Sequence, residues 1–545
     1  MTVLAPASFP RSARVPALGA DGMVSSSHPA ISRAGAEVLA SGGNAVDAAL
    51  AMAAVAWLAL PGQCGVGGDA FALVRAPDGR VRAFCGSGFG PDGGTPEHHH
   101  RAGSGRLLPR YGASSVTAPG AVAALAALHA HGASRPLTEL WEPAVRTAAR
   151  GLPCTARTRD DIAGHRDRLA ADPDTAAAFL PGGRVPRVGT RLVHPRLAAT
   201  IATLARDPAA FYTGALADRA VADLVAGGAP FSGEEWAETG RVAAEDAVAT
   251  RYAGHVVHQT PLPTPGWMVL DQLALCAGTL SPGGPAGTPL GVDAVHRLAG
   301  AARIAFDDRF RLAGSDRPAP DRRLDPGLLD RGRRLLGTGP LPDPAGVRPD
   351  GDTTSMVAVD GDGCAVGVIG SLAFTFGSGR AVPGTGVVLN NRLGRGAYAI
   401  PGHPNEVRPR RRPLHTLNTW IVTDDAGRLR HVGNTPGGDG QVQWNTQLLS
   451  HLLDHGAGPQ DAVDAPRFTV FPGSDAGDLG SPAELRCEDR LGPDVLAGLA
   501  ARGHRVVTVG DHGAGGSAQV VSVDPDTGCL AGGSDARQEG VALGV

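Results

Sequence analysis

The stretch Gly351-Asp-Thr-Thr-Ser-Met-Val-Ala-Val-Asp360 decides how the rest of the chain is interpreted. A Gly-Asp-Gly turn follows it, and then a second apolar run, Cys364-Ala-Val-Gly-Val-Ile-Gly-Ser-Leu372. Two apolar runs around a glycine-containing turn predict a β-hairpin. On strand propensity alone, Thr353 and Thr354 are ordinary β-branched residues at the start of the first strand. The sequence on either side of the hairpin gives Thr353 a different interpretation.

The composition is that of a folded protein with many turns. The chain has 545 residues, 42% of them hydrophobic, with 78 Gly and 44 Pro. That is enough for several domains or for one large layered domain. The net charge of −3 shows no basic excess, so nucleic acid is not an expected partner. The seven cysteines are scattered without metal-ligand spacing and are interpreted as reduced thiols.

No segment is expected to enter a membrane. Prolines interrupt the N-terminal apolar residues, so we expect no secretion signal and a cytoplasmic protein. The most apolar segment, Ala45 to Leu60, is shorter than a bilayer span and carries Asp47. It is apolar on nearly every face, which predicts a buried core helix capped by Asn44.

Neither a cofactor nor a metal ion is expected. The loop Gly65-Val-Gly-Gly68 follows a helical pattern rather than a strand, so it does not have the context of a dinucleotide fingerprint. The adjacent residues His98, His99 and His100 cannot all face one ion without further ligands, and no carboxylate or cysteine cluster accompanies them. They are interpreted as solvated loop residues.

Helical patterns dominate the first part of the chain and strand patterns the last part. Helical spacing recurs as far as Phe310, whereas strand-like runs prevail after Ser355. Between them, residues 315–352 are rich in Pro, Gly, Asp and Arg, which predicts a mobile linker that ends at Thr353. This order favours layered α+β elements over two independent domains.

Nine short motifs in a fixed order carry a family resemblance. They are Ser41-Gly-Gly-Asn-Ala-Val-Asp-Ala-Ala49, Phe211-Tyr-Thr-Gly214, Ala305-Phe-Asp-Asp-Arg309, Thr353-Thr354 with Val359-Asp360, Phe376-Gly-Ser-Gly379, Pro383-Gly-Thr-Gly-Val-Val-Leu-Asn-Asn391, Pro436-Gly-Gly438, Ala465-Pro-Arg-Phe468 and Ser534-Asp-Ala-Arg537. From about His28 to Gly540 the chain resembles the γ-glutamyltransferases of the N-terminal-nucleophile hydrolase superfamily. The resemblance implies a four-layer αββα sandwich. It also implies a precursor that cuts itself into residues 1–352 and 353–545, which stay packed together as a heterodimer, with a higher oligomer possible.

The resemblance also implies the catalytic groups. The Thr353 hydroxyl would attack the carbonyl of Asp352, and hydrolysis of the resulting ester would free the α-amine of Thr353. That amine can then serve as the base that the weakly nucleophilic hydroxyl needs. Gly437 and Gly438 match the pair of backbone donors that stabilises the oxyanion. Ser371 falls where the family has a threonine that hydrogen-bonds the nucleophile.

The sequence departs from the family pattern where the substrate is recognised. The stretch Cys85-Gly-Ser-Gly-Phe-Gly-Pro91 lacks the family's carboxylate-binding arginine, and Arg395 stands where the family has an amine-binding aspartate. Arginines suit a compact acyl group that bears a carboxylate and no amine. We therefore expect this group to be bound by Asn391, Arg392, Arg395, His415 and Thr416. The alternative is that Arg392 and Arg395 point into solvent, as most surface arginines do.

Three functions follow from these observations. The first is a self-processing threonine hydrolase or acyltransferase that acts on a small anionic amide or keto-acid. Relatives with altered pockets resemble oxamate-type amidohydrolases, cephalosporin acylases and natural-product enzymes that cleave a C–C bond next to a keto-acid. The second is a true γ-glutamyl hydrolase or transpeptidase acting on glutathione-like substrates. The third is an inactive homologue with a binding or structural role.

Overall fold

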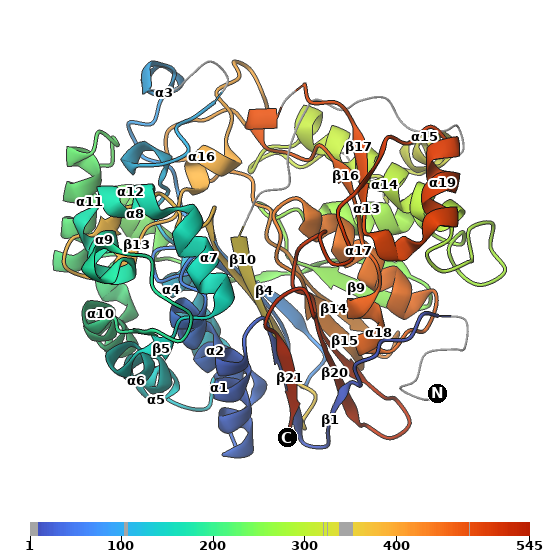
Figure 1. The fold of residues 1–545 in the computed structure, drawn as a ribbon, viewed down its shortest axis with the longest axis horizontal. Helices are drawn as coiled ribbons and strands as arrows, with labels where there is room; N and C mark the ends of the chain where they lie inside the picture. The colour runs from blue at the N-terminus through green and yellow to red at the C-terminus, as the bar shows by residue number, and fades with distance from the viewer. Residues whose placement is uncertain (1–8, 103–106, 320, 324, 337–351, 479) are drawn as a thin grey trace.

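Two β-sheets packed face to face form the centre of the molecule (Figure 1). The computed structural model describes residues 9–102, 107–319, 321–323, 325–336, 352–478 and 480–545. Within these residues, helices cover the outer face of each seven-stranded sheet, so the layers run α, β, β and α. The predicted αββα sandwich is confirmed.

The first sheet has the predicted hairpin at its centre. Its two strands pair antiparallel, and each also pairs with a strand from the N-terminal part of the chain. The order across the sheet is β21 (Val541–Gly544), β2 (Gly22–Ser26), β10 (Asp352–Asp360), β11 (Ala365–Ala373), β3 (Asp69–Arg75), β4 (Val81–Gly86) and β7 (Ala244–Asp246). Segments before and after Thr353 therefore share one continuous hydrogen-bonded sheet.

The second sheet packs against the first through alternating apolar side chains. Its order is β1 (Ala17–Gly19), β20 (Leu530–Ser534), β19 (Gln519–Val523), β15 (Leu429–Asn434), β14 (Thr419–Thr423), β9 (His255–Gln259) and β8 (Val248–Tyr252). Val357 and Leu73 from the first sheet meet Ile421, Val432 and Val521 from the second in one buried cluster. Burying each such side chain stabilises the fold by roughly 1.5–3 kcal/mol, and these contacts hold the two sheets together.

Helix α2 (Ala45–Ala59) is the core helix on the outer face of the first sheet. All of its residues are buried, and it packs on β10 and β11. Asn44 and Asp47 form a reciprocal capping box at its start, as the sequence led us to expect of Asn44. The other elements of this half are α1 (Pro29–Ala40), α3 (Pro96–Ala102), α4 (Ala121–Gly132), α5 (Leu137–Leu140), α6 (Glu142–Arg150), β5 (Leu152–Pro153), α7 (Ala156–Gly164), α8 (Arg166–Ala171), α9 (Pro173–Phe179), β6 (Arg191–Leu192), α10 (Pro195–Arg206), α11 (Ala215–Ala226), α12 (Glu234–Thr239), β12 (Ala381–Val382), β13 (Val387–Val388) and α16 (Arg392–Gly396).

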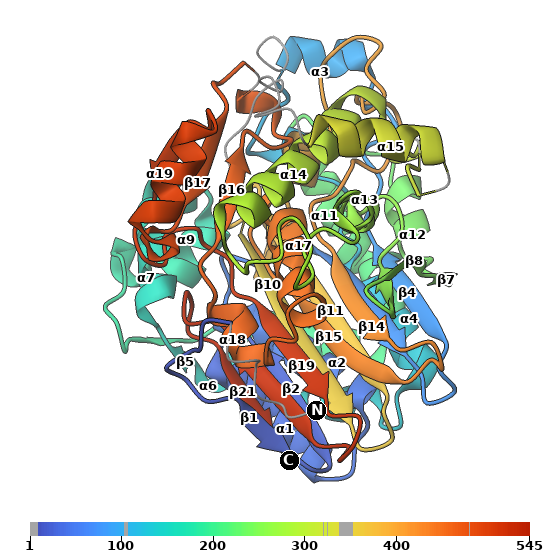
Figure 2. The same ribbon diagram turned by 90° about the vertical axis from the view of Figure 1, so that its right-hand side faces the viewer.

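The outer face of the second sheet is covered by a separate helical layer, which stands in front of β14, β15 and β19 in Figure 2. Its apolar faces form one cluster with Trp420 and Val520 of the sheet. The elements on this side are α13 (Gly266–Cys276), α14 (Val292–Leu312), α15 (Pro326–Leu335), α17 (Gly440–Leu453), α18 (Pro459–Asp464), β16 (Phe468–Phe471), β17 (Glu484–Cys487), α19 (Pro493–Ala501) and β18 (Val506–Thr508). No helix in the described parts of the chain is both long and apolar enough to cross a membrane.

Two expectations differ from the structure. The predicted linker over 315–352 contains helix α15, whose Arg333 donates a hydrogen bond to the Ala274 carbonyl, while residues 337–351 lie outside the described residues. The three histidines form a helix rather than a solvated loop, and His99 is fully buried. The Thr95 hydroxyl accepts the His98 N–H at the start of this helix, a local cap that the composition argument overlooked.

Candidate active site

Thr353 lies in an irregular part of the central hairpin. The β10–β11 pairing shifts register between Asp352 and Thr354, so Thr353 has no direct cross-strand partner. Such bulges redirect a side chain out of the regular alternation. The neighbouring strand carries a matching irregularity, because Ala373 has a φ of 83°, which non-glycine residues rarely adopt. The nucleophile predicted from the sequence thus occupies a locally distorted strand start, and the side chain of Asp352 lies outside the described residues.

Hydroxyl and amide groups surround the Thr353 side chain. Its hydroxyl donates a hydrogen bond to the Ser371 hydroxyl at 3.3 Å, and the Gln441 amide approaches it at 3.5 Å. The Ser371 oxygen also accepts the N–H of Ala373 at 2.9 Å, which fixes its position. Thr354 instead faces the interior and donates to the Gln63 side chain at 3.2 Å. The structure therefore brings together Thr353 and Ser371, as predicted, and adds Gln441.

Gly437 and Gly438 form the turn between β15 and α17. Their φ values of 127° and 55° lie in the region that favours glycine. A Cβ at Gly437 would overlap the Trp444 ring, so the residue must also be small. Their carbonyls accept the first N–H groups of α17, whereas neither glycine N–H donates a hydrogen bond within the described residues. Such N–H groups at a helix N-terminus are suited to stabilise an oxyanion.

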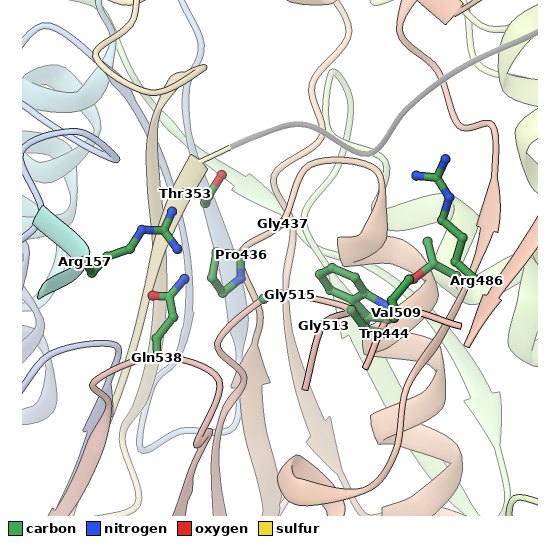
Figure 3. A pocket seen from close by; sticks show the side chains of 13 residues that line it. Arg157, Thr353, Pro436, Gly437, Trp444, Arg486, Val509, Gly513, Gly515 and Gln538 are labelled. Atoms are coloured by element: carbon green, nitrogen blue, oxygen red, sulfur yellow. The ribbon is translucent and has the colours of Figure 1, made fainter. Parts of the chain in front are cut away.

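Thr353 and Gly437 line a cavity of about 280 Å³ (Figure 3). Arg157 and Gln538 project into it on the side of Thr353, and Arg486 lies at the far end beyond Trp444. The cavity is lined by Arg157, Thr353, Pro436, Gly437, Trp444, Thr469, Arg486, Val509, Gly513, Ala514, Gly515, Gly516 and Gln538. None of these described lining residues is acidic, although Arg157 and Arg486 pair through Nε with Asp161 and Glu484 behind the lining.

Arg392 and His415 are buried around one carboxylate and do not line this cavity. Arg392 Nε donates to Asp69 Oδ2 at 3.1 Å, and His415 Nε2 lies 3.2 Å from the same oxygen. Burial, and to a smaller extent the nearby Arg392 guanidinium, lowers the pKa of His415 to about 4, although Asp69 opposes both. His415 is therefore neutral at pH 7, and its contact with Asp69 is not an ion pair. Burial lowers the pKa of Arg392 to about 10, and the guanidinium keeps its charge.

Arg395 forms a second buried ionic group beside the glycine turn. It donates to Asp439 Oδ2 at 2.8 Å and lies 3.6 Å from Asp475. Asp439 directly follows Gly438 and also accepts two hydrogen bonds from Ser474. Burial alone would raise the pKa of Asp439, but the neighbouring arginines lower it overall, so the carboxylate is ionised. Arg395 thus supports the turn that carries the expected oxyanion donors.

Asn391 and Thr416 are also buried away from the cavity. The Asn391 side chain accepts the N–H of Phe374 at 3.0 Å and donates to the Arg110 carbonyl at 2.7 Å, which anchors the end of β11 beside Ser371. The Thr416 carbonyl faces the side-chain amide of Asn418 at 3.4 Å. None of the five residues expected to bind substrate lines the cavity at Thr353, and their role in binding stays a prediction.

Sequence reasoning did not find Arg157 and Gln538. Arg157 lies in the first turn of α7, and its Nε donates to Asp161 at 2.9 Å. Gln538 directly follows Arg537, whose buried guanidinium binds Glu488 and Asp535. Nothing in the local pattern separates Arg157 from the neighbouring charged residues of the helix, because its position depends on how α7 packs beside β11.

The layered sandwich is the fold of N-terminal-nucleophile hydrolases, and Thr353, Ser371 and the two glycines lie where a nucleophile and its oxyanion donors are predicted. Within that class, the chain belongs to the gamma-glutamyltranspeptidase family, whose model matches residues 31–545.

Several characterised proteins are similar over nearly the whole chain. A glutathione hydrolase-like YwrD proenzyme of Bacillus subtilis is 33% identical, covering 97% of this chain and 99% of the relative. An oxamate amidohydrolase proenzyme of Klebsiella pneumoniae is 30% identical, over 96% and 98%. The crystal structure of a cephalosporin acylase from Bacillus halodurans superimposes with a TM-score of 0.89 at 31% identity, over 99% of both chains. By their names, these relatives act on different substrates.

Proposed function

We propose that this protein is a self-processing threonine hydrolase that removes a compact, carboxylate-bearing acyl group from an amide or keto-acid derivative. The observation that supports the proposal most is the cavity at Thr353. Its described lining residues include two arginines and no carboxylate. A ligand carboxylate would gain charge-assisted hydrogen bonds there, whereas a ligand ammonium would find no counter-ion.

Processing would begin with attack of the Thr353 hydroxyl on the carbonyl carbon of Asp352. The peptide C–N bond breaks as the C–O ester bond forms, and the nitrogen of Thr353 takes up a proton to become an amine. Water then hydrolyses the ester and leaves residues 1–352 and 353–545. Strand pairs that cross the cut, β10 with β2 and β11 with β3, would keep the fragments together as a heterodimer.

Turnover would use the same hydroxyl with the new α-amine as its base. The hydroxyl oxygen attacks the substrate carbonyl, and its proton passes by way of the amine to the departing amine of the substrate. The N–H groups of Gly437 and Gly438 would stabilise the tetrahedral oxyanion. Water, or an acceptor amine, then cleaves the ester and restores Thr353. Ser371 and Gln441 would hold the attacking oxygen in place.

A second candidate is hydrolysis or transfer of a γ-glutamyl group from a glutathione-like substrate. It is favoured by the similarity to the glutathione hydrolase-like protein of Bacillus subtilis. Such a substrate carries an ammonium as well as a carboxylate, and it would need an acidic group near Thr353. The described lining of the cavity offers none, which is why we place this candidate second.

Intact-mass measurement of the purified protein tests the first half of the proposal. Fragments of residues 1–352 and 353–545 are expected, and Thr353→Ala is expected to stay uncut. An uncut wild-type chain would contradict self-processing and favour an inactive homologue.

Release of 4-nitroaniline from oxalyl, succinyl, glutaryl and γ-glutamyl 4-nitroanilides tests the substrate class. The oxalyl, succinyl and glutaryl groups carry no ammonium. We expect at least one of these three anilides to be cleaved faster than the γ-glutamyl anilide. The reverse order would show that the second candidate is right.

A further inference from the structure

Arg157 is placed differently from the arginines that the sequence suggested for substrate binding. The side chains of Arg392 and Arg395 are 1% and 2% exposed and paired with buried carboxylates, whereas that of Arg157 is 34% exposed. In Figure 3 the guanidinium of Arg157 extends into the cavity toward Thr353 and Pro436. A small ligand could reach Arg157 without breaking a buried ion pair.

A hydrogen bond within helix α7 holds the Arg157 side chain in its orientation. Asp161, one turn further along α7, accepts a hydrogen bond from Nε at 2.9 Å. Ile162 on the opposite side of α7 is fully buried with Leu372 and Phe376, which belong to β11 and its continuation. The helix is thus anchored to the strand that carries Ser371. A guanidinium held in this way loses less side-chain entropy when it binds an anion.

Gln538 lies beside Arg157 on the same wall of the cavity (Figure 3). Its Oε1 is buried and has no hydrogen-bond partner within the described residues. The amide N–H groups of Gln538, rather than this oxygen, are the donors that would bind the same carboxylate as the Arg157 guanidinium. The two residues come from opposite sides of the expected cut, since Arg157 lies before Thr353 and Gln538 after it.

We propose that Arg157, assisted by Gln538, binds the carboxylate of the acyl group and so determines substrate specificity. This inference rests on the proposed function. The carboxylate would lie against the Arg157 fork while the scissile carbonyl oxygen points at the N–H groups of Gly437 and Gly438. Because Arg157 and Gln538 come from different fragments, the acyl site is complete only while residues 1–352 and 353–545 stay together. At about 280 Å³, the cavity fits a short diacid unit better than a large acyl group.

A matched pair of substrates tests the role of Arg157. The succinyl 4-nitroanilide carries a carboxylate, and the 4-methylpentanoyl 4-nitroanilide replaces it with an isopropyl group of the same shape. In Arg157→Gln we expect kcat/KM for the anionic substrate to fall roughly 30- to 100-fold, mainly through KM. For the neutral substrate we expect a change of less than about threefold, since it makes no charge-assisted bond. Gln538→Leu should lower only the anionic value, by roughly fivefold, because it removes neutral donors.

Arg159→Gln is the control, because it removes the same charge from the same helix outside the cavity. We expect it to keep the wild-type preference for the anionic substrate. If Arg157→Gln also keeps that preference, the inference is wrong. If the wild type has the same kcat/KM for the anionic and the neutral substrate, the proposed substrate class is wrong. The wild-type measurement alone shows this, before any variant is compared.

Arg157→Lys covers the case in which Arg157→Gln is not processed. It keeps the charge but replaces the planar fork by a single ammonium, so a loss of about tenfold on the anionic substrate is expected. An unchanged kcat/KM in a processed Arg157→Lys protein would overturn the inference.

Discussion

The enclosed residues Arg392 and Arg395 differ from Arg157 in what their charges face. Arg392 and Arg395 are enclosed and face Asp69, Asp439 and Asp475, whereas Arg157, although its Nε pairs with Asp161, extends into a cavity. Removing one partner from an enclosed pair strands the other charge away from water, so such pairs are costly to open. The comparison indicates that the enclosed arginines maintain the shape of the site and that the exposed one is available for recognition.

The enclosed pairs hold the two ends of the expected catalytic group. Asp69 lies directly across from Ser371 in the β3–β11 pairing, so the Arg392 pair supports the strand beside the hydroxyl. Asp439 follows the two glycines, so the Arg395 pair supports the oxyanion turn. Variants at these positions should therefore change stability first, while variants in the cavity should change selectivity first.

The largest expected effect comes from Thr353, the predicted nucleophile. Thr353→Ala removes the hydroxyl, so we expect no processing and a fall in turnover of roughly 10⁴-fold or more. Thr354→Ala is the control, because its hydroxyl binds Gln63 in the interior and Thr354 is not among the residues that line the cavity at Thr353. It should still be processed, with a loss of about 1–3 kcal/mol in the free energy of unfolding. Electrophoresis and the anilide assay measure both outcomes, and a processed Thr353→Ala chain would refute the mechanism.

The second largest effect is expected at the oxyanion turn. Gly437→Ala forces a side chain into the Trp444 ring at a φ of 127°, so the turn must move and its N–H with it. Loss of one such donor lowers kcat by roughly 10²–10³-fold. Gly427→Ala is the matched control, because that glycine also has a positive φ but nothing lies near its Cβ position. If both variants lose activity equally, backbone strain rather than a lost donor is the cause.

Opening an enclosed pair gives the third effect. Arg392→Met leaves the Asp69 carboxylate buried without its guanidinium, and we expect unfolding free energy to fall by about 3–5 kcal/mol. The double variant Arg392→Met/Asp69→Leu should recover much of that loss, because no buried charge is stranded. Thermal unfolding measures both proteins. The folded fraction of Arg392→Met should still prefer the anionic anilide. If this preference is lost, Arg392 rather than Arg157 binds the substrate carboxylate.

Several elements of the fold could be predicted from the sequence because their patterns are local, whereas the four-layer arrangement was implied by the family resemblance. The hairpin around Gly361-Asp-Gly363, the largely apolar helix with its Asn44 cap and the glycine turn each depend on neighbouring residues, and all are present in the structure. The contact between Thr353 and Ser371 is a cross-strand consequence of that hairpin. The family motifs placed these elements in one order.

The charged part of the site could not be predicted in the same way. Whether an arginine is enclosed depends on partners far away in sequence, such as Asp69 for Arg392 and Asp439 for Arg395. A motif comparison shows that a residue type has changed but not which carboxylate now balances it. Arg157 was missed for the same reason, since the packing of α7 on Leu372 is a long-range contact.

The smallest expected effect is a change in the pH dependence of stability caused by His415, which is neutral although it lies beside buried ion pairs. His415 has a pKa of about 4 when folded, mainly because of burial, and 6.5 is its ordinary value. The unfolded chain therefore takes up a proton below pH 6.5 that the folded chain does not take up until about pH 4. The contribution of His415 to stability is complete above pH 6.5 and declines as the pH falls. At pH 5.5 the loss is about 1 kcal/mol.

His415→Gln replaces the titrating imidazole by an amide that takes up no proton, while it keeps a polar group beside Asp69. The drop in thermal midpoint between pH 7.5 and 5.5 should be smaller in the variant than in the wild type. Other buried histidines with lowered pKa values, such as His431 and His451, stay in both proteins, so the difference between the two drops isolates His415. An equal drop in both proteins would mean that His415 is already protonated and paired with Asp69. The enclosed group would then carry a net positive charge, and an anion could bind there as well as at Arg157.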